Sequence, residues 1–219
     1  MKNAAQEFGA DRMYSLKEAI ESIEKFPKVK FDETVELHFS LNIDTKNSDQ
    51  VIRGTVLLPH GTGKNVRIAV FCKGEQESKA KEAGADHIGA EELIDRVSKG
   101  FMDFDVVIAT PDMMRDLSKL GKILGPRGLM PTPKAGTVSA DVAKAIREVK
   151  AGKIEFKSDK QAGIHVIVGK RSFAKEKLLD NANHVIEAIN HVKPASVKGN
   201  LLKNVSLSTT MGPGLKVVI

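Results

Sequence analysis

Residues 66–72, VRIAVFC, form a nearly continuous apolar run in this 219-residue chain. A strand with this pattern is typical of a parallel sheet whose two faces are both covered by helices. Segments with helical character follow at 75–84 and 90–100, and a second apolar run, DVVIA, occupies 105–109. This alternation of buried strands and helices predicts a Rossmann-like three-layer α/β domain, which we place at residues 66–156.

The second half of this domain contains an unusual loop. Thr110-Pro111-Asp112 predicts a helix start with proline in the first turn, and SADVAKAIREVKAG predicts a helix that ends at Gly152. Between them, KILGPRGLMPTPKAGTV (122–138) contains three prolines, three glycines and three cations. Proline and glycine at this density exclude an ordinary helix or central strand. We therefore expect a stiff, irregular and basic loop.

Both ends of the chain follow a different pattern. TVELHFSLNI (34–43) alternates between apolar and polar residues, which predicts a half-buried strand with one polar face. Ser15-Leu16-Lys17-Glu18 is a capping box that predicts the start of an amphipathic helix. A long helix is expected from Ser172 to about Val192. Further strands are expected at VIRGTVLL (51–58), KNVSLSTT (203–210) and LKVVI (215–219), and KIEFKS (153–158) and IHVIVGK (164–170) are expected to pair around the turn DKQAG.

These patterns predict two domains. A discontinuous α+β domain, formed by residues 1–65 and 157–219, would contain the α/β domain as an insertion. The formal net charge of +6 lies in the last segment, because residues 157–219 hold 10 cations and 4 acids while the other two segments are nearly neutral. A basic surplus of this kind favours a polyanionic partner.

Several kinds of chemistry are not supported. Cys72 lies alone within an apolar run and is expected to be an inert buried thiol. PHGTGK (59–64) lacks two defining positions of a phosphate-binding loop, because Leu58 and Asn65 occupy them. No histidine spacing suits a metal, and no apolar run approaches the ~20 residues that a membrane span needs. The sequence therefore predicts a cytoplasmic, non-enzymatic protein with no cofactor, metal site, membrane partner or small-molecule substrate.

Two features point to nucleic acid. Ser206, Ser208 and Thr210 are spaced two residues apart, so their hydroxyls are expected on one face of a strand. Such hydroxyls can exchange hydrogen bonds with ribose and phosphate, although a solvated edge strand gives the same spacing. The same part of the chain supplies phosphate-binding cations at Lys157, Lys160, Lys170, Arg171, Lys175 and Lys177, although a charge run of this kind can also be a solvated face.

The motifs together resemble a known family. KILGPRGLMPTPKAGTV is similar, almost residue for residue, to the most characteristic segment of the bacterial ribosomal protein L-one family, which forms the mobile stalk of the large subunit. LPHGTGK (58–64), NIDTKNSDQVIRGTV (42–56) and TTMGPG (209–214) match the family in the same order. The resemblance extends from about Tyr14 to Leu215 and implies the same two domains, with ribosomal RNA bound by the one built from both chain ends.

The resemblance also implies the residues that contact RNA. Its principal contacts correspond to Lys30, Phe31, Thr34, Glu36, Thr210, Met211 and Gly212, with His165 and Lys170 as weaker additions. Ser208 is a further candidate contact, which comes from the hydroxyl spacing and not from the resemblance. Lysine suits phosphate, an exposed phenylalanine offers an apolar platform, and glycine allows close backbone approach. Relatives usually begin with a longer basic segment, whereas Met1–Arg12 has two cations and two acids, so no RNA contact is predicted for it.

The implied function is structural and regulatory. The protein would bind ribosomal RNA of the stalk, assist release of deacylated transfer RNA from the exit site, and repress translation of its own messenger RNA. In the basic loop, Lys122, Arg127 and Lys134 would form a secondary surface for the stalk or for the departing transfer RNA. A nucleotide-dependent enzyme is disfavoured by the missing phosphate motifs. A general single-strand binder is disfavoured by the scarcity of aromatic residues.

Overall fold

The computed structural model describes residues 12–27, 29–194, 196–197 and 199–218, with the side chain of Ser48 left aside. The chain divides into two compact units, one formed by Met1–Gly63 and Ile154–Ile219 and the other by Lys64–Lys153. The divisions lie slightly earlier in the chain than the boundaries expected after residues 65 and 156. We call these parts the split unit and the inserted unit.

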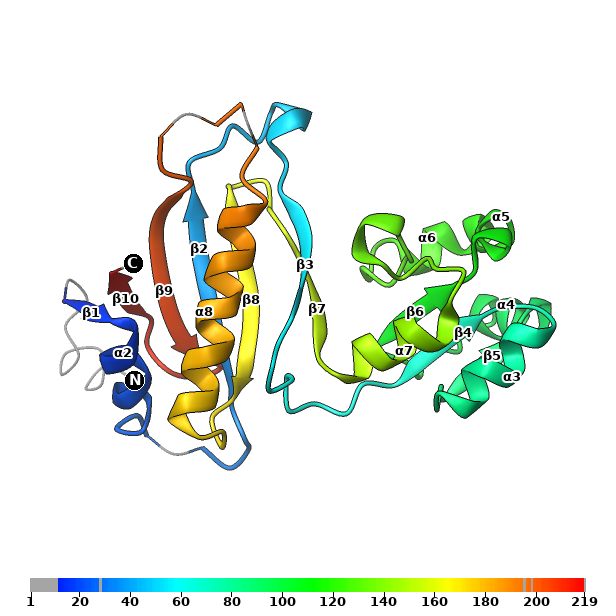
Figure 1. Cartoon of the computed structure of the whole chain (residues 1–219), viewed down its shortest axis with the longest axis horizontal. Coiled ribbons are helices and arrows are strands. Elements are labelled where there is room, and N and C mark those ends of the chain that lie inside the picture. The colour runs from blue at the N-terminus through cyan, green and yellow to red at the C-terminus, as the bar shows by residue number, and fades with distance from the viewer. Residues whose placement is uncertain (1–11, 28, 195, 198, 219) are drawn as a thin grey trace. The chain divides into compact units, whose positions relative to one another are not determined.

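The split unit is built around a five-stranded sheet with the order β1-β10-β9-β2-β8 (Figure 1). Its strands are β1 (Met13–Ser15), β2 (Thr34–Leu41), β8 (Gly163–Lys170), β9 (Leu202–Thr209) and β10 (Leu215–Val218). β1 runs parallel to β10, and the other pairings are antiparallel. The strand that begins at Met13 was not anticipated, because three residues are too few to show an alternating pattern.

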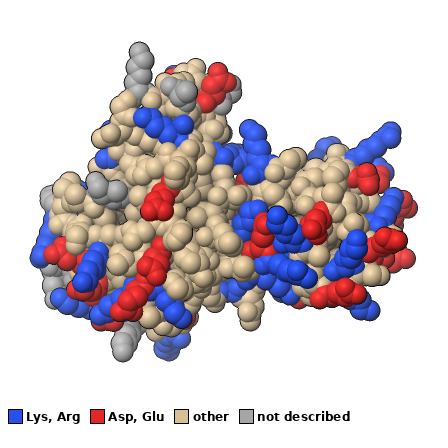
Figure 2. Space-filling model, in the orientation of Figure 1, with Lys and Arg blue, Asp and Glu red and all other residues tan. Residues whose placement is uncertain are grey.

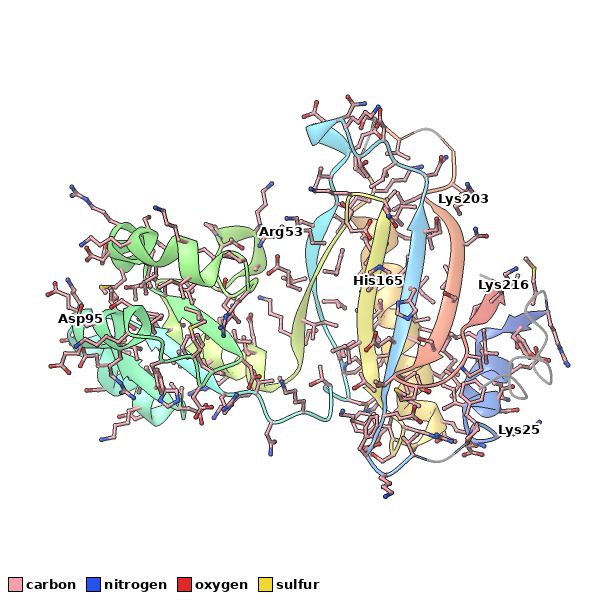
Figure 3. The ribbon with its side chains drawn as sticks, turned by 180° about the vertical axis from the view of Figure 1, so that it is seen from behind. Lys25, Arg53, Asp95, His165, Lys203 and Lys216 are labelled. Atoms are coloured by element: carbon pink, nitrogen blue, oxygen red, sulfur yellow. The ribbon has the colours of Figure 1, made fainter. Side chains whose placement is uncertain are left out.

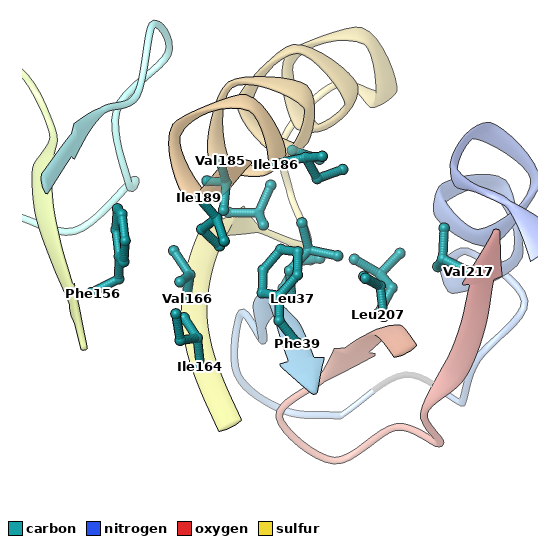
Figure 4. Packing of buried hydrophobic residues seen from close by; sticks show 14 of the residues in the cluster. Leu37, Phe39, Phe156, Ile164, Val166, Val185, Ile186, Ile189, Leu207 and Val217 are labelled. Carbon is teal, nitrogen blue, oxygen red and sulfur yellow. The ribbon is translucent and has the colours of Figure 1, made fainter. Parts of the chain in front are cut away.

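Two helices cover one face of this sheet. α2 (Leu16–Ile23) begins with the predicted capping box, in which Ser15 Oγ accepts from the Glu18 amide and Glu18 Oε2 accepts from the Ser15 amide. α8 (Lys175–His191) is the predicted long helix. Figure 4 shows its Val185 and Ile189 facing Leu37 and Phe39 of β2, all within one buried cluster. The residues of β2 alternate between buried and half-exposed, so this strand presents polar side chains to the opposite face of the sheet.

The expected pairing of residues 153–158 with 164–170 is wrong. β7 (Lys153–Lys157) pairs with β3 (Arg53–Leu57) in a separate two-stranded sheet, whereas β8 pairs with β2. The residue after β7 is hydrogen-bonded to the residue before β3. The Ser158 amide donates to Ile52 O over 2.8 Å, and Ser158 Oγ accepts from the Ile52 amide over 3.1 Å. Alternation predicted each strand but not its partner.

The inserted unit contains a parallel three-stranded sheet with the order β5-β4-β6. Its strands are β4 (Ile68–Phe71), β5 (His87–Gly89) and β6 (Val106–Ala109), and its α-helices are α3 (Glu75–Glu82), α4 (Glu91–Ser98), α5 (Met114–Leu117), α6 (Gly121–Leu124) and α7 (Val142–Lys150). Every residue of β4 is buried, as the apolar run predicted. The helix expected after Asp112 is instead a series of short helical turns.

Separate hydrophobic clusters lie on the two faces of this sheet. Ile68 and Val70 pack with Ile146 of α7, whereas Ala69 and Phe71 belong to a cluster with residues of α4 and α5. This arrangement follows from the strand geometry, because successive side chains point to opposite faces and both faces are apolar. Helices therefore cover both faces of the parallel sheet.

Candidate nucleic-acid interface

The polar face of the five-stranded sheet carries several of the predicted residues. In the strand register, Ser206 lies opposite His38, which lies opposite His165. Ser208 lies opposite Glu36 in the neighbouring row. Directly opposed residues point to the same face of a sheet, so all five side chains share the face that α2 and α8 leave uncovered. Figure 3, seen from behind, shows this face with His165 on β8.

His38 connects His165 to Ser208. Its Nδ1 lies 2.8 Å from Nδ1 of His165, and its Nε2 lies 2.8 Å from Ser208 Oγ. Burial lowers the pKa of His38, the charge of His165 lowers it further, and the Glu36 carboxylate opposes both effects. A neutral imidazole offers one donor and one acceptor, which suits this chain of contacts. His38 was not predicted as a site residue, although its polar position in TVELHFSLNI was the available signal.

At the end of the sheet, three predicted residues meet. The Thr34 amide donates to Thr210 Oγ1 over 3.0 Å, and the Thr210 amide donates to Thr34 O over 3.1 Å. Lys170 Nζ donates to Thr34 Oγ1 over 3.0 Å and to Asp32 O over 3.3 Å. These residues come from the ends of β2 and β8 and from the residue after β9. The fold therefore places two hydroxyls and an ammonium group within one small area.

The remaining predicted residues flank this area in sequence. Phe31 and Met211 have 52% and 47% of their surface exposed, and Lys30 is also exposed. Gly212 lies close to other parts of the turn, because an added Cβ would lie 2.3 Å from Thr209 Oγ1 and 2.7 Å from Phe26 Cδ2. Exposed apolar side chains beside hydroxyls and cations can contact bases, ribose and phosphate together.

A buried ion pair lies directly behind this area. Glu33 is 1% exposed, and its Oε2 accepts from Arg171 Nη1 over 2.5 Å. Burial raises the pKa of Glu33, but hydrogen bonds from Arg171, Met211 and Thr209, together with the guanidinium charge, lower it more, so the net pKa lies below its ordinary value. Glu33 was not among the predicted site residues, and Arg171 was noted only as one of several cations. A buried acid cannot be distinguished by sequence spacing from its exposed neighbours.

The basic loop of the inserted unit is anchored through its apolar residues. Leu124 is buried in the cluster beside β4, and Leu129 and Met130 pack against that cluster. Lys122, Arg127 and Lys134 are all exposed. Figure 2 shows basic and acidic side chains intermixed on the face of the inserted unit that it presents. The structure therefore leaves the three cations accessible without gathering them, on this face, into a patch of one sign.

Other polar groups have structural partners. Asp105 accepts from Lys64 Nζ over 2.7 Å and from Arg67 Nε over 3.1 Å. The hydrogen bond from Lys64, followed by those from Arg67 and by the charge of Lys64, lowers the pKa of Asp105 to about 2 although burial opposes the shift. Asp103 is paired with Arg67 as well.

The described part of the chain contains no cluster of three or more acidic, histidine or cysteine side chains suited to a metal. Within the same residues, no helix is both long and apolar enough to cross a membrane. A groove beside β9 and β10 is lined by Lys203 and Lys216, which Figure 3 labels, and by Ser206 of the hydroxyl strand, but by none of the RNA contacts that the resemblance implies. Met1–Arg12, for which no RNA contact is predicted, lies outside the described chain up to residue 11.

Comparison with known proteins identifies the class to which the chain belongs, that of ribosomal proteins. The family model described as "Ribosomal protein L1p/L10e family" matches residues 21–213, so the chain belongs to this family. It is 57% identical over 205 residues to the large ribosomal subunit protein uL1 of Thermosipho melanesiensis, covering 93% of this chain and 88% of that protein. The uL1 protein of Protochlamydia amoebophila is 54% identical over 217 residues, covering 99% and 92%. These relatives are ribosomal proteins and not enzymes.

Proposed function

We propose that this protein is a cytoplasmic component of the large ribosomal subunit that binds ribosomal RNA of the mobile stalk. The split unit would make the principal contacts. The observation that carries this assignment is the meeting of Thr34, Lys170 and Thr210 at one end of the uncovered sheet face, beside exposed Phe31 and Met211. Membership of the ribosomal family supports the choice of RNA over other polyanions.

Each part of the surface suits a different part of RNA. Lys30 and Lys170 would contact phosphate, and the Thr34 and Thr210 hydroxyls have remaining hydrogen-bonding capacity for ribose. Phe31 and Met211 would pack against exposed bases or sugars. Gly212 would allow the backbone to approach the RNA closely. Glu36, Ser208 and His165 would extend the contact along the sheet face.

Two further roles are proposed for the same protein. Exposed Lys122, Arg127 and Lys134 would form a secondary RNA surface on the inserted unit, contacting either the stalk or transfer RNA that leaves the exit site. Through this surface the protein would assist release of deacylated transfer RNA. It would also repress translation of its own messenger RNA wherever that RNA mimics the ribosomal site. The messenger RNA would then be bound by the same surface of the split unit that binds ribosomal RNA.

A titration of stalk RNA with the full-length protein tests the assignment. Lys30→Gln removes one exposed cation from the proposed principal surface, and Lys134→Gln removes one from the secondary surface. We expect Lys30→Gln to weaken binding several-fold and Lys134→Gln to have a smaller effect. If Lys134→Gln is the more damaging change, the principal site belongs to the inserted unit. If the wild-type protein neither binds stalk RNA nor cosediments with large subunits after a high-salt wash, the proposed function is wrong.

A further inference from the structure

The Glu33 carboxylate is bound on two sides. Its Oε2 accepts from Arg171 Nη1 over 2.5 Å, while its Oε1 accepts from Thr209 Oγ1 over 3.1 Å and from the Met211 amide over 3.0 Å. A buried carboxylate is unfavourable unless it is paired and hydrogen-bonded, and Glu33 is paired with Arg171 and accepts three hydrogen bonds. Glu33 thus contacts the residues immediately before and after Thr210.

Arg171 extends the same network in the other direction. Its Nη1 donates to Pro27 O over 3.0 Å, and its Nη2 donates to Phe26 O over 2.6 Å. The Arg171 amide donates to Glu33 O over 2.8 Å. The planar guanidinium, with its fixed fork of donors, therefore joins the segment before Lys30 to Glu33. Its side chain is 15% exposed, so it is largely unavailable to a partner in solution.

The network fixes the geometry of the candidate interface. Thr34 follows Glu33, and its amide donates to Thr210 Oγ1 over 3.0 Å. Thr210 lies between the two residues that Glu33 contacts, and Gly212 N donates to Thr209 O over 3.1 Å to close the turn. We propose that Glu33 and Arg171 are a positioning pair that pre-orders the turn of residues 209–212 for RNA binding without touching the RNA. This inference rests on the proposed function.

The sign of one mutational effect separates positioning from simple electrostatics. Glu33→Gln removes a negative charge behind the RNA surface, which by itself would strengthen the binding of a polyanion. In the folded protein, however, the single oxygen of glutamine can replace only one carboxylate oxygen, so the new amide donors would face the donors of either Arg171 or the Met211 amide. We expect stalk-RNA affinity to fall about tenfold, in the direction opposite to the change in charge. An increase or no change would overturn the proposal.

The second variant tests Arg171 against a matched cation. Arg171→Met removes the guanidinium, and Lys177→Met removes one exposed positive charge from the same region of the split unit. If Arg171 acts only through net charge, the two variants weaken RNA binding equally. We expect Arg171→Met to weaken stalk-RNA binding at least fivefold more than Lys177→Met does. Combining it with Glu33→Gln should restore part of the loss, since no buried charge is then left unpaired.

Hydrogen exchange in the absence of RNA provides an independent measurement. Loss of the positioning pair should accelerate exchange of the Met211 amide much more than exchange of the Leu207 amide in β9. Equal acceleration at both would show only a general loss of stability and would overturn the proposal. If Glu33→Gln fails to fold, Thr209→Val removes one of the bonds to Glu33 and is expected to give a smaller change of the same kind. Failure of wild-type protein to bind stalk RNA would reject the proposed function but leave the exchange result interpretable.

Discussion

The Thr34 amide donates a hydrogen bond to Thr210 Oγ1 over 3.0 Å, although 176 residues separate these threonines in sequence. The Thr210 amide returns a bond to Thr34 O over 3.1 Å. The N-terminal and C-terminal segments of the split unit therefore meet at the candidate interface. A hydroxyl has two acceptor lone pairs, so Thr210 Oγ1 retains one for a partner.

Replacing Thr210 with valine is expected to affect both stability and RNA binding. Valine keeps the branched shape but removes the acceptor of the Thr34 amide. Since this amide is near solvent, we expect a loss of about 0.5–1.5 kcal/mol in unfolding free energy, and a separate weakening of stalk-RNA binding by about 1–3 kcal/mol. Thr210→Ser, which keeps the hydroxyl, is the control. Thermal unfolding and titration at one fixed salt concentration measure the two effects. If the valine variant has the stability and RNA affinity of the wild type, the Thr210 hydroxyl only faces solvent.

The sequence predicted the strands themselves more reliably than it predicted which strands pair. The alternation in residues 34–43 and the apolar run in β4 identified strands correctly, because burial on one or both faces dictates these patterns. The pairing of β7 with β8 was wrong because the contacts of Ser158 with Ile52 join segments far apart in the chain. Pattern alone does not report such contacts.

The candidate site shows the same limit. Thr34 and Thr210 were predicted, through the family resemblance, as separate contacts, but their direct hydrogen bond depends on the register of β2 with β9. His38 was recognised only as a polar strand position, since its link to His165 requires β8 as the neighbouring strand. Glu33 was missed because its burial arises from the packing around Arg171 and Thr209.

RNA binding should depend strongly on salt. If several phosphates are neutralised, the logarithm of affinity falls linearly with the logarithm of salt concentration, with a slope of roughly 0.7–0.9 per phosphate contact. Lys30→Gln should reduce this slope by the amount that about one phosphate contact contributes, whereas Thr210→Ser should leave the slope unchanged. Titrations between ~50 and ~200 mM salt measure the slope. A flat dependence for the wild-type protein would remove the electrostatic part of the proposal.

The titration of His38 should respond to His165. Burial and the charge of His165 both lower the pKa of His38, so removing the second cause with His165→Gln should raise that pKa without restoring its ordinary value. Because the folded-state pKa lies below the unfolded one, the unfolded state binds more protons over the interval between them. The contribution of His38 to stability is therefore fully present above pH 6.5, the ordinary pKa of histidine, and is lost as the pH falls below that value. NMR titration of the two imidazoles measures the shift, and an unchanged His38 would contradict the coupling.

Asp105 should stabilise the inserted unit in an acid-sensitive way. Its pKa is lowered from 3.8 to about 2, chiefly by Lys64, so its contribution is present above pH ~4 and disappears between that value and about 2. The shift corresponds to about 2 kcal/mol at most, and since Lys64 and Arg67 are exposed we expect about 1 kcal/mol. Hydrogen exchange of β4 amides should show Asp105→Asn less stable than wild type at pH 7 and equal to it near pH 2. A difference that is constant with pH would exclude the ion pairs as its cause.

Two neighbouring glycines offer a matched test of the turn at residues 209–212. A Cβ at position 212 would lie 2.3 Å from Thr209 Oγ1 and 2.7 Å from Phe26 Cδ2, whereas a Cβ at position 214 would meet nothing within 4 Å. Both changes add the same methyl group to the same loop. Only the first requires movement of Thr209, whose hydroxyl donates to Glu33 Oε1 over 3.1 Å.

Gly212→Ala is therefore expected to disturb the candidate interface, and Gly214→Ala is expected to leave it intact. Moving the Thr209 hydroxyl away from a buried carboxylate leaves a lone pair of Glu33 unoccupied, which typically costs about 1–3 kcal/mol in unfolding free energy. Overpacking against Phe26 adds a cost of similar size. The displaced turn carries Thr210 and Met211, so stalk-RNA affinity should fall at least tenfold for Gly212→Ala, while Gly214→Ala should bind within twofold of wild type. Unfolding experiments and RNA titrations on both variants measure these effects, and equal behaviour of the two alanines would show that close packing at Gly212 has no part in shaping the site.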